Sequence, residues 1–258
     1  MNVHELSTKE LRSIAPAMFS EAHAPGLSSK YAHFNTAHIV ERLGNEGFYP
    51  VRAFQARTRS GRSSFAKHQV ALRAQGQQKI LGGLYPEINI RTDHAGLSSW
   101  KVDIGMFRLV CLNGMVVGAG HFDTIRIRHT RKTMDEVLLA CIPAAKRFSA
   151  VSDTVARMID RKLTLEERVA MAEFGLKLRF PAIAPIPATE LLLTHRKEDQ
   201  RSDLWTTLNV IQENVIRGGA YVKNRRVRGI FEIDRSTDIN KALWDNAEQM
   251  LVNRSGGH

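Results

Sequence analysis

Basic side chains gather in three short stretches of the chain, and none of these stretches contains a carboxylate. The first stretch runs from Arg52 to Arg73, the second from Arg126 to Lys132, and the third from Arg217 to Arg228. Guanidinium and ammonium groups neutralise the phosphates of a nucleic-acid backbone. The residues that we expect to bind nucleic acid are Arg52, Arg57, Arg59, Arg62, Lys67, Arg73, Arg126, Arg128, Lys132, Arg217, Lys223, Arg225, Arg226 and Arg228.

The first stretch reads as a β-hairpin that turns at Ser60-Gly61. A hairpin would set its basic side chains along an exposed rim, spaced for successive phosphates. Phe54 and Phe65 lie near enough in the sequence to stack on bases. The alternative is a charged edge strand that only prevents pairing with other chains.

The second stretch, TIRIRHTRK, alternates like a strand. We expect Ile125 and Ile127 to face the core, while the basic residues, together with His129, face outward. If this strand shares a face with the first hairpin, the sheet has a positive surface.

The third stretch follows the segment DLWTTLNVIQENVIRGG, which reads as a helix that is capped by Ser202 or Asp203 and ends at Gly218-Gly219. Its apolar stripe, expected in the core, is Leu204, Leu208, Ile211 and Val215. A polar flank lies beside this stripe: Thr206, Asn209, Gln212, Glu213 and Arg217. Amides can read base edges, but we favour a structural role that ties the helix to the sheet. For the basic turn, the alternative to phosphate binding is a solvated loop.

Histidines and aspartates form one candidate catalytic set. Its members are His68, Asp93, His94, Asp103, His121 and Asp123. Such side chains could hold a divalent cation and cleave phosphodiesters, although their spacing matches no compact metal motif. His68 lies among apolar strand residues and is expected to be a hydrogen-bonded core histidine. We therefore expect no catalytic residue, metal or cofactor, and a metal-dependent nuclease stays as an alternative.

The composition supports a polyanionic partner. The 258 residues carry 37 Lys and Arg against 26 Asp and Glu, a formal charge of +11. Nucleic acid is the first partner that such an excess favours. Cys111 and Cys141 form no CxxC pair, and the sequence contains neither a signal-peptide pattern nor a membrane span. We expect a cytoplasmic protein with no membrane partner.

The elements that must position these residues indicate an α+β fold. We expect an N-terminal arm over 1–35, a β-rich region over 36–132 and a helical region over 133–258, integrated into one domain. The sheet would be antiparallel and curved, with the C-terminal helices packed on one side of it. Trp100, Trp205 and Trp244 are expected in the core, with Trp205 anchoring its helix against the sheet.

Several local signals place the boundaries of these elements. Capping boxes at Ser7–Glu10 and Thr164–Glu167 predict two helix starts. Thr36 is the expected cap of a helix that stops near Gly44, and Asn113-Gly114 predicts a hairpin turn. Further helices are expected from Thr133, with an interruption at Pro143, over ATELLLTH, and from Ser236 to Asn253.

Three blocks of the sequence resemble a known family. KHQVALR, FRLVCLNGMVVG and DLWTTLNVIQENVIRGG, together with NKALWDNAEQM, are similar to the phage and plasmid family catalogued as domain of unknown function 932. The resemblance covers roughly residues 35 to 253. It implies a role in the maintenance of mobile elements and brings no catalytic residues.

Together these observations predict a protein that binds single-stranded nucleic acid, preferably DNA, in the recombination or replication of a mobile element. Strand annealing or protection fits this function, and a homo-oligomer would accompany it. The competing hypothesis is an inhibitor that binds a host defence or restriction factor.

Overall fold

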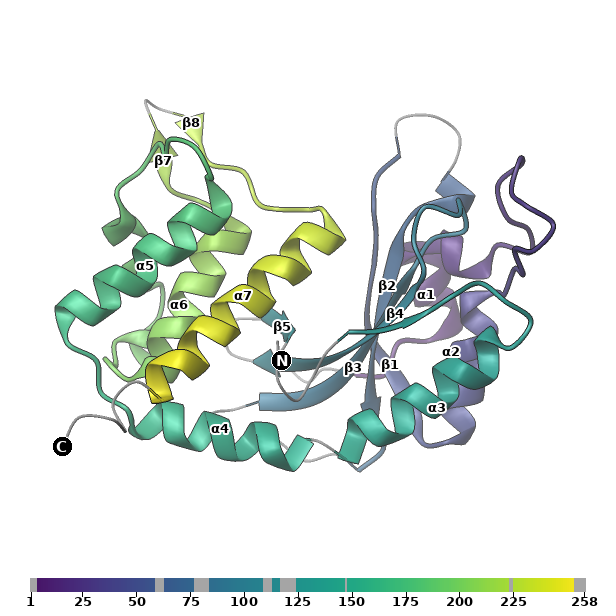
Figure 1. The fold of residues 1–258 in the computed structure, drawn as a ribbon, viewed down its shortest axis with the longest axis horizontal. Helices are drawn as coiled ribbons and strands as arrows, with labels where there is room; N and C mark the ends of the chain where they lie inside the picture. The colour runs from purple at the N-terminus through teal and green to yellow at the C-terminus, as the bar shows by residue number, and fades with distance from the viewer. Residues whose placement is uncertain are drawn as a thin grey trace. The chain divides into compact units, whose positions relative to one another are not determined.

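The chain folds into two compact units. In the computed structural model, the described residues are 4–58, 63–76, 84–108, 113–116, 124–146, 148–222 and 225–252. The first unit comprises residues 1–116 and 120–148, and the second comprises 117–119 and 149–258. Figure 1 shows the elements of both units along the chain.

An antiparallel, unclosed sheet forms the centre of the first unit. Its strands are β1 (Phe48–Gln55), β2 (His68–Ala74), β3 (Leu84–Thr92), β4 (Trp100–Arg108), β5 (Asn113–Val116) and β6 (Ile125–Ile127). The order is β1-β2-β3-β4-β5, and β6 pairs with the beginning of β4. From β1 to β5, consecutive strands are neighbours, which is the usual arrangement in an antiparallel sheet.

The two faces of this sheet differ in chemistry because side chains alternate along each strand. One face carries Val70, Leu72, Ile88, Ile90 and Val102, all of which are buried. The opposite face carries polar and charged side chains: Gln69, Arg73, Glu87, Asn89, Arg91 and Asp103.

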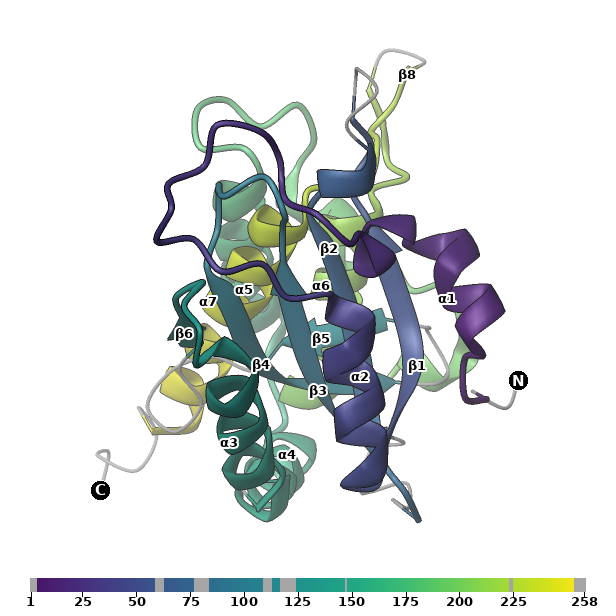
Figure 2. The same cartoon turned by 90° about the vertical axis from the view of Figure 1, so that its right-hand side faces the viewer.

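Two helices cover the apolar face. Both α2 (Thr36–Asn45) and α3 (Thr133–Lys146) contact the sheet and each other, and Figure 2 shows them crossing the same side. Asn35 caps α2 by accepting a hydrogen bond from the Ala37 amide, so the predicted cap, Thr36, is one residue too late. The predicted interruption at Pro143 is also wrong, since α3 continues past it to Lys146.

The Asn113-Gly114 signal identified a hairpin but not its turn. Both residues lie within β5, where Asn113 pairs with Arg108 and Gly114 pairs with Phe107. The connection between β4 and β5 therefore spans residues 109–112, which lie outside the described part of the chain. The Ser60-Gly61 turn between β1 and β2 lies outside it as well.

Helices build the second unit. They are α4 (Phe148–Asp160), α5 (Leu165–Arg179), α6 (Leu204–Arg217) and α7 (Ile233–Val252), and a short hairpin of β7 (Tyr221–Val222) and β8 (Arg225–Arg226) follows α6. The capping boxes predicted for α5 and for α1 (Thr8–Ile14) are confirmed. The short helix predicted over ATELLLTH is present as a 3-10 helix over Ala188–Leu192.

The central helix of this unit is α6, which packs against α5 and α7 (Figure 1). All four residues of its predicted apolar stripe are buried. Gly175 of α5 permits this close packing, because a Cβ there would lie 2.8 Å from the Ile211 side chain. Trp205 is buried and meets Trp244 of α7 edge to face, with 6.4 Å between ring centroids.

The α+β class predicted from the sequence is confirmed. Trp205 anchors α6 to α7 within the second unit. All three tryptophans are buried, as predicted.

Candidate nucleic-acid interface

The first basic stretch divides into exposed and buried members. Arg57 is exposed and Lys67 is half-buried, while Arg59 and Arg62 lie outside the described residues. Arg73 is buried, with 4% of its side chain exposed, so the prediction of an exposed rim is wrong for this residue.

The reason for the burial of Arg73 is the carboxylate of Glu87 on β3. Glu87 is fully buried, and its two oxygens accept hydrogen bonds from Arg73 Nη2 at 2.6 Å and Arg52 Nη2 at 2.5 Å. A second ion pair on the same face joins Arg91 Nε to Asp103 Oδ2 at 2.9 Å. Because buried charges require partners, Arg52 and Arg73 have a structural role in the sheet.

The second basic stretch presents its charges to solvent. Arg126, Arg128 and Lys132 are exposed, as predicted. Ile127 is buried, but Ile125 is exposed rather than in the core.

His129 also differs from its prediction, because its ring faces inward. The ring accepts a hydrogen bond at Nδ1 from Trp100 Nε1 (3.1 Å), so Nε2 carries the proton and donates to the Ser98 carbonyl (3.0 Å).

The histidine and aspartate set does not form a metal centre among the described residues. His121 and Asp123 lie outside them. His68 is buried, with its ring nitrogens 2.7 Å from the Thr36 hydroxyl and 2.8 Å from the Ala66 carbonyl, which confirms its prediction as a core histidine. Asp93 accepts hydrogen bonds from the Ala95 and Leu97 amides and so shapes its own turn. Within the described part of the chain, no group of three potential ligands is placed to hold a metal ion.

Buried histidines next to this turn have lowered pKa values. Burial lowers the pKa of His68 to about 4 and that of His94 to about 2, and in His94 the neighbouring His68 and His33 add to the effect. The rings of His33 and His94 lie 4.5 Å apart, and those of His68 and His94 lie 5.0 Å apart. The imidazoles of His68 and His94 are therefore neutral at physiological pH and act as core side chains.

The polar flank of α6 has a structural role, as the sequence favoured. Gln212 Nε2 donates to Asn240 Oδ1 on α7 at 2.9 Å, and Asn209 Nδ2 donates to the Trp205 carbonyl at 2.7 Å. Asp203 caps the helix through the Thr206 amide. These amides are used within the unit and are not presented to a ligand.

Glu213, near the end of α6, organises the basic residues around it. Its carboxylate receives two hydrogen bonds from Arg196, at 2.6 and 2.7 Å, and one from Arg217 at 2.9 Å. The Arg217 pair has the i, i+4 spacing predicted from the sequence. This carboxylate thus orients two guanidinium groups. Arg196 Nη1 also pairs with Asp199 Oδ2 at 2.8 Å, so two carboxylates balance the two guanidinium charges.

Gly218 turns the chain from α6 into the β7–β8 hairpin. Its φ of +66° and ψ of −148° suit glycine alone. A Cβ at this position would lie 2.5 Å from the Val227 carbonyl oxygen and 2.8 Å from that of Arg228. The glycine therefore lets the returning strand close onto the end of α6.

A cavity of about 770 Å³ lies beside this turn, and Arg196, Arg217 and Arg226 are among the residues that line it. Arg217, Arg226 and Arg228 are exposed. Arg225 lies in β8, and Lys223 lies outside the described residues. We call Arg217, Arg226 and Arg228 the turn arginines.

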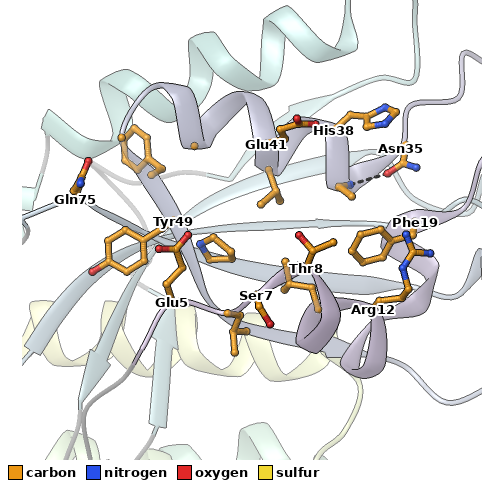
Figure 3. A pocket seen from close by; sticks show the side chains of 18 of the residues that line it. Glu5, Ser7, Thr8, Arg12, Phe19, Asn35, His38, Glu41, Tyr49 and Gln75 are labelled. Atoms are coloured by element: carbon orange, nitrogen blue, oxygen red, sulfur yellow. Dashed lines mark hydrogen bonds between the residues drawn. The ribbon is translucent and has the colours of Figure 1, made fainter.

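Another cavity, of about 1140 Å³, has the opposite character. It lies between α1 and α2 over β1, with Glu5 beside Tyr49 at one end and Arg12 over the ring of Phe19 at the other (Figure 3). Its charged lining consists of three carboxylates, Glu5, Glu21 and Glu41, and one guanidinium. This acidic excess disfavours phosphate.

Sequence reasoning missed three arginines near the basic turn: Arg179, Arg196 and Arg235. Arg235 lies next to Asp234, Arg196 lies two residues before Glu198, and Arg179 lies at the end of a predicted helix, so each resembles an ordinary surface charge. Only the packing of the helices brings them to this region.

No helix among the described residues has both the length and the apolar character needed to span a membrane.

Comparison with known proteins adds a family but no activity. The family model described as Domain of unknown function (DUF932) matches residues 26–244. The chain is similar to two proteins of Escherichia coli (strain K12), UPF0380 protein YafZ and UPF0380 protein YfjQ. Each is 34% identical over 254 residues, which cover 96% of this chain and 92% of the relative. No solved structure matches the chain.

Proposed function

The chain belongs to the DUF932 family, and from its geometry we propose that it binds single-stranded nucleic acid through the turn arginines. The observation that carries this proposal is the placement of Arg217, Arg226 and Arg228 beside the Gly218 turn, where all three are exposed. Guanidinium groups suit phosphates, because their planar donors match the phosphate oxygens.

The local charge balance supports this assignment. Glu213 and Asp199 together offset the charges of Arg196 and Arg217, so the positive excess at the turn comes from its other arginines. Arg226 and Arg228 add positive charge at the same turn. A formal charge of +11 on the whole chain would draw a polyanion toward it from a distance.

An exposed aromatic side chain favours single strands over duplex. Phe231 follows the turn and is 72% exposed. Unpaired bases stack on such rings, whereas the bases of a duplex are already stacked on each other. If the bases of a bound strand can still pair with a complementary strand, the protein would promote strand annealing. Such an activity fits a role in the recombination or replication of a mobile element.

The direct test compares two triple variants of equal charge in anisotropy measurements with labelled single-stranded DNA. Replacing Arg217, Arg226 and Arg228 with alanine should weaken binding at least about tenfold and reduce the slope of log K against log salt by about 2, because three phosphate contacts are lost. The control replaces Lys9, Lys30 and Arg42, which are exposed on the first unit, with alanine. Equal losses of affinity in both variants would mean that binding depends only on the net charge of the protein. No loss of affinity in the first variant would overturn the proposal.

A further inference from the structure

A third, smaller cavity lies where α5 ends and α7 begins. Its volume is about 440 Å³, and it is lined by Arg179, Phe180, Arg228, Gly229, Ile230, Phe231, Glu232 and Arg235. Three of these residues are arginines and one is a carboxylate, and the cavity is therefore basic.

Arg179 is the unusual residue in this cavity. It is only 6% exposed, and its Nη2 donates to the carbonyl of Arg228. Its Nε and Nη1 are buried and have no hydrogen-bond partner within the described residues. No carboxylate in that part of the chain pairs with it, whereas Arg52, Arg73, Arg91 and Arg196 each have one.

A buried guanidinium group whose N–H donors lack hydrogen-bond partners is stabilised by a bound anion. Burial lowers the pKa of Arg179, and the neighbouring charge of Arg235 lowers it further, so the cationic form lacks compensation. An unpaired buried charge is unfavourable and is kept where a ligand supplies the counter-charge.

Two further donors converge on the same cavity. Arg235 lies in the first turn of α7, and its Nη2 donates to the Arg179 carbonyl at 2.8 Å, which leaves its other nitrogens available to a ligand. The start of α7, a helix of 20 residues, also borders the cavity through Glu232 and Arg235. A helix N-terminus offers free amides and a partial positive charge to a phosphate.

Aromatic rings frame the arginines. Phe180 lies under the Arg179 guanidinium, 5.2 Å from it to the ring centroid. Phe231, on the other side of Gly229, leaves most of its ring open to solvent. An anion site beside an open aromatic ring matches a nucleotide, in which a phosphoryl group and a planar base lie close together.

We infer that this cavity binds one nucleotide of the strand, with its phosphoryl group on Arg179, Arg228 and Arg235 and its base on Phe231. This inference rests on the proposed function and specifies where one nucleotide sits. The same chemistry would also accept a free nucleoside monophosphate, so the experiment includes one.

The test uses the full chain, a labelled oligothymidylate in anisotropy measurements and thymidine 5′-monophosphate in calorimetry. Arg179→Gln should weaken oligothymidylate binding at least about tenfold, and Phe231→Ala should weaken it about fivefold or more, because the contact with phosphate or base is lost. The matched control is Lys177→Gln, an exposed charge on the same helix that lines no described cavity. Thermal unfolding of Arg179→Gln without ligand should stay close to that of the wild type, because the loss of the hydrogen bond to the Arg228 carbonyl is offset by the removal of an unpaired buried charge.

The outcomes separate this inference from the proposed function. Wild-type affinity in both Arg179→Gln and Phe231→Ala, or losses no greater than in Lys177→Gln, would overturn the cavity assignment and leave the turn arginines as the binding surface. If the wild-type protein fails to bind oligothymidylate, the proposed function falls. Binding of thymidine monophosphate that Arg179→Gln abolishes would in that case still support the cavity as a nucleotide site.

Discussion

Glu87 shows how a single carboxylate determines whether basic residues distant in the sequence are buried in an ion pair or exposed to solvent. It holds Arg52 and Arg73 on neighbouring strands and is fully buried between them. From sequence alone, these arginines are indistinguishable from the exposed Arg57. Their separation into structural and exposed residues depends on strand pairing, which places β3 next to β2.

Replacing Glu87 with glutamine should destabilise the first unit by about 3–5 kcal/mol, because two guanidinium groups would lose their buried counter-charge. Chemical denaturation measures this loss. Glu41→Gln, an exposed carboxylate on α2, is the control and should stay within about 0.5 kcal/mol of the wild type. If the two variants were equally stable, the ion pairs on the sheet would contribute nothing.

The buried histidines give the protein a defined pH dependence. The native pKa values of His68 and His94, about 4 and about 2, lie below the ordinary value of 6.5. The unfolded chain therefore binds more protons than the native chain as the pH falls below 6.5, and the free energy of unfolding decreases. Each histidine contributes about 1.4 kcal/mol per pH unit between pH values of about 6 and 4.

Urea denaturation at a series of pH values between about 7 and 5 tests this linkage. His94→Gln should reduce the pH slope of the unfolding free energy by about one proton equivalent. An unchanged slope would mean that His94 titrates normally in the folded protein.

At the scale of elements, local signals were sufficient where a few adjacent residues determine the structure. The capping boxes of α1 and α5 and the apolar stripe of α6 are of this kind. The Asn113-Gly114 pair failed because pairing with β4 continues through both residues and overrides their turn propensity. The sequence did not identify α5 and α7 as packing partners of α6, since an apolar stripe does not specify which surface covers it.

Gly218 is the element-level feature on which the basic turn depends. Gly218→Ala should destabilise the second unit by about 1–3 kcal/mol, because a Cβ there collides with the returning backbone. Single-stranded DNA binding should weaken in the same variant, since the hairpin can no longer close onto α6. Thermal unfolding and anisotropy measure the two effects.

A second glycine provides the control for this substitution. Gly44 lies within α2, and a Cβ there would meet no atom within 4 Å. Gly44→Ala should be neutral or stabilising by about 0.5–1 kcal/mol, because alanine favours the helix. If Gly218→Ala behaved in the same way, the turn would not need its glycine.

At the scale of the whole molecule, composition predicted the class of partner more readily than the site. The charge of +11 is a property of the whole chain, while the proposed interface depends on a few arginines of the second unit. The sequence identified Arg217, Arg226 and Arg228 because they cluster along the chain. It could not identify Arg179 and Arg235, because only the packing of α5 and α7 brings them to one cavity.

The measurement that tests the central claim most directly is the anisotropy of wild-type protein with labelled single-stranded and duplex DNA between about 50 and 200 mM salt. We expect tighter binding to the single strand and a linear fall of log K with log salt, as for a protein that contacts several phosphates. No binding to the single strand across this range, or binding that does not change with salt, would contradict the proposed function and direct the search to a protein partner.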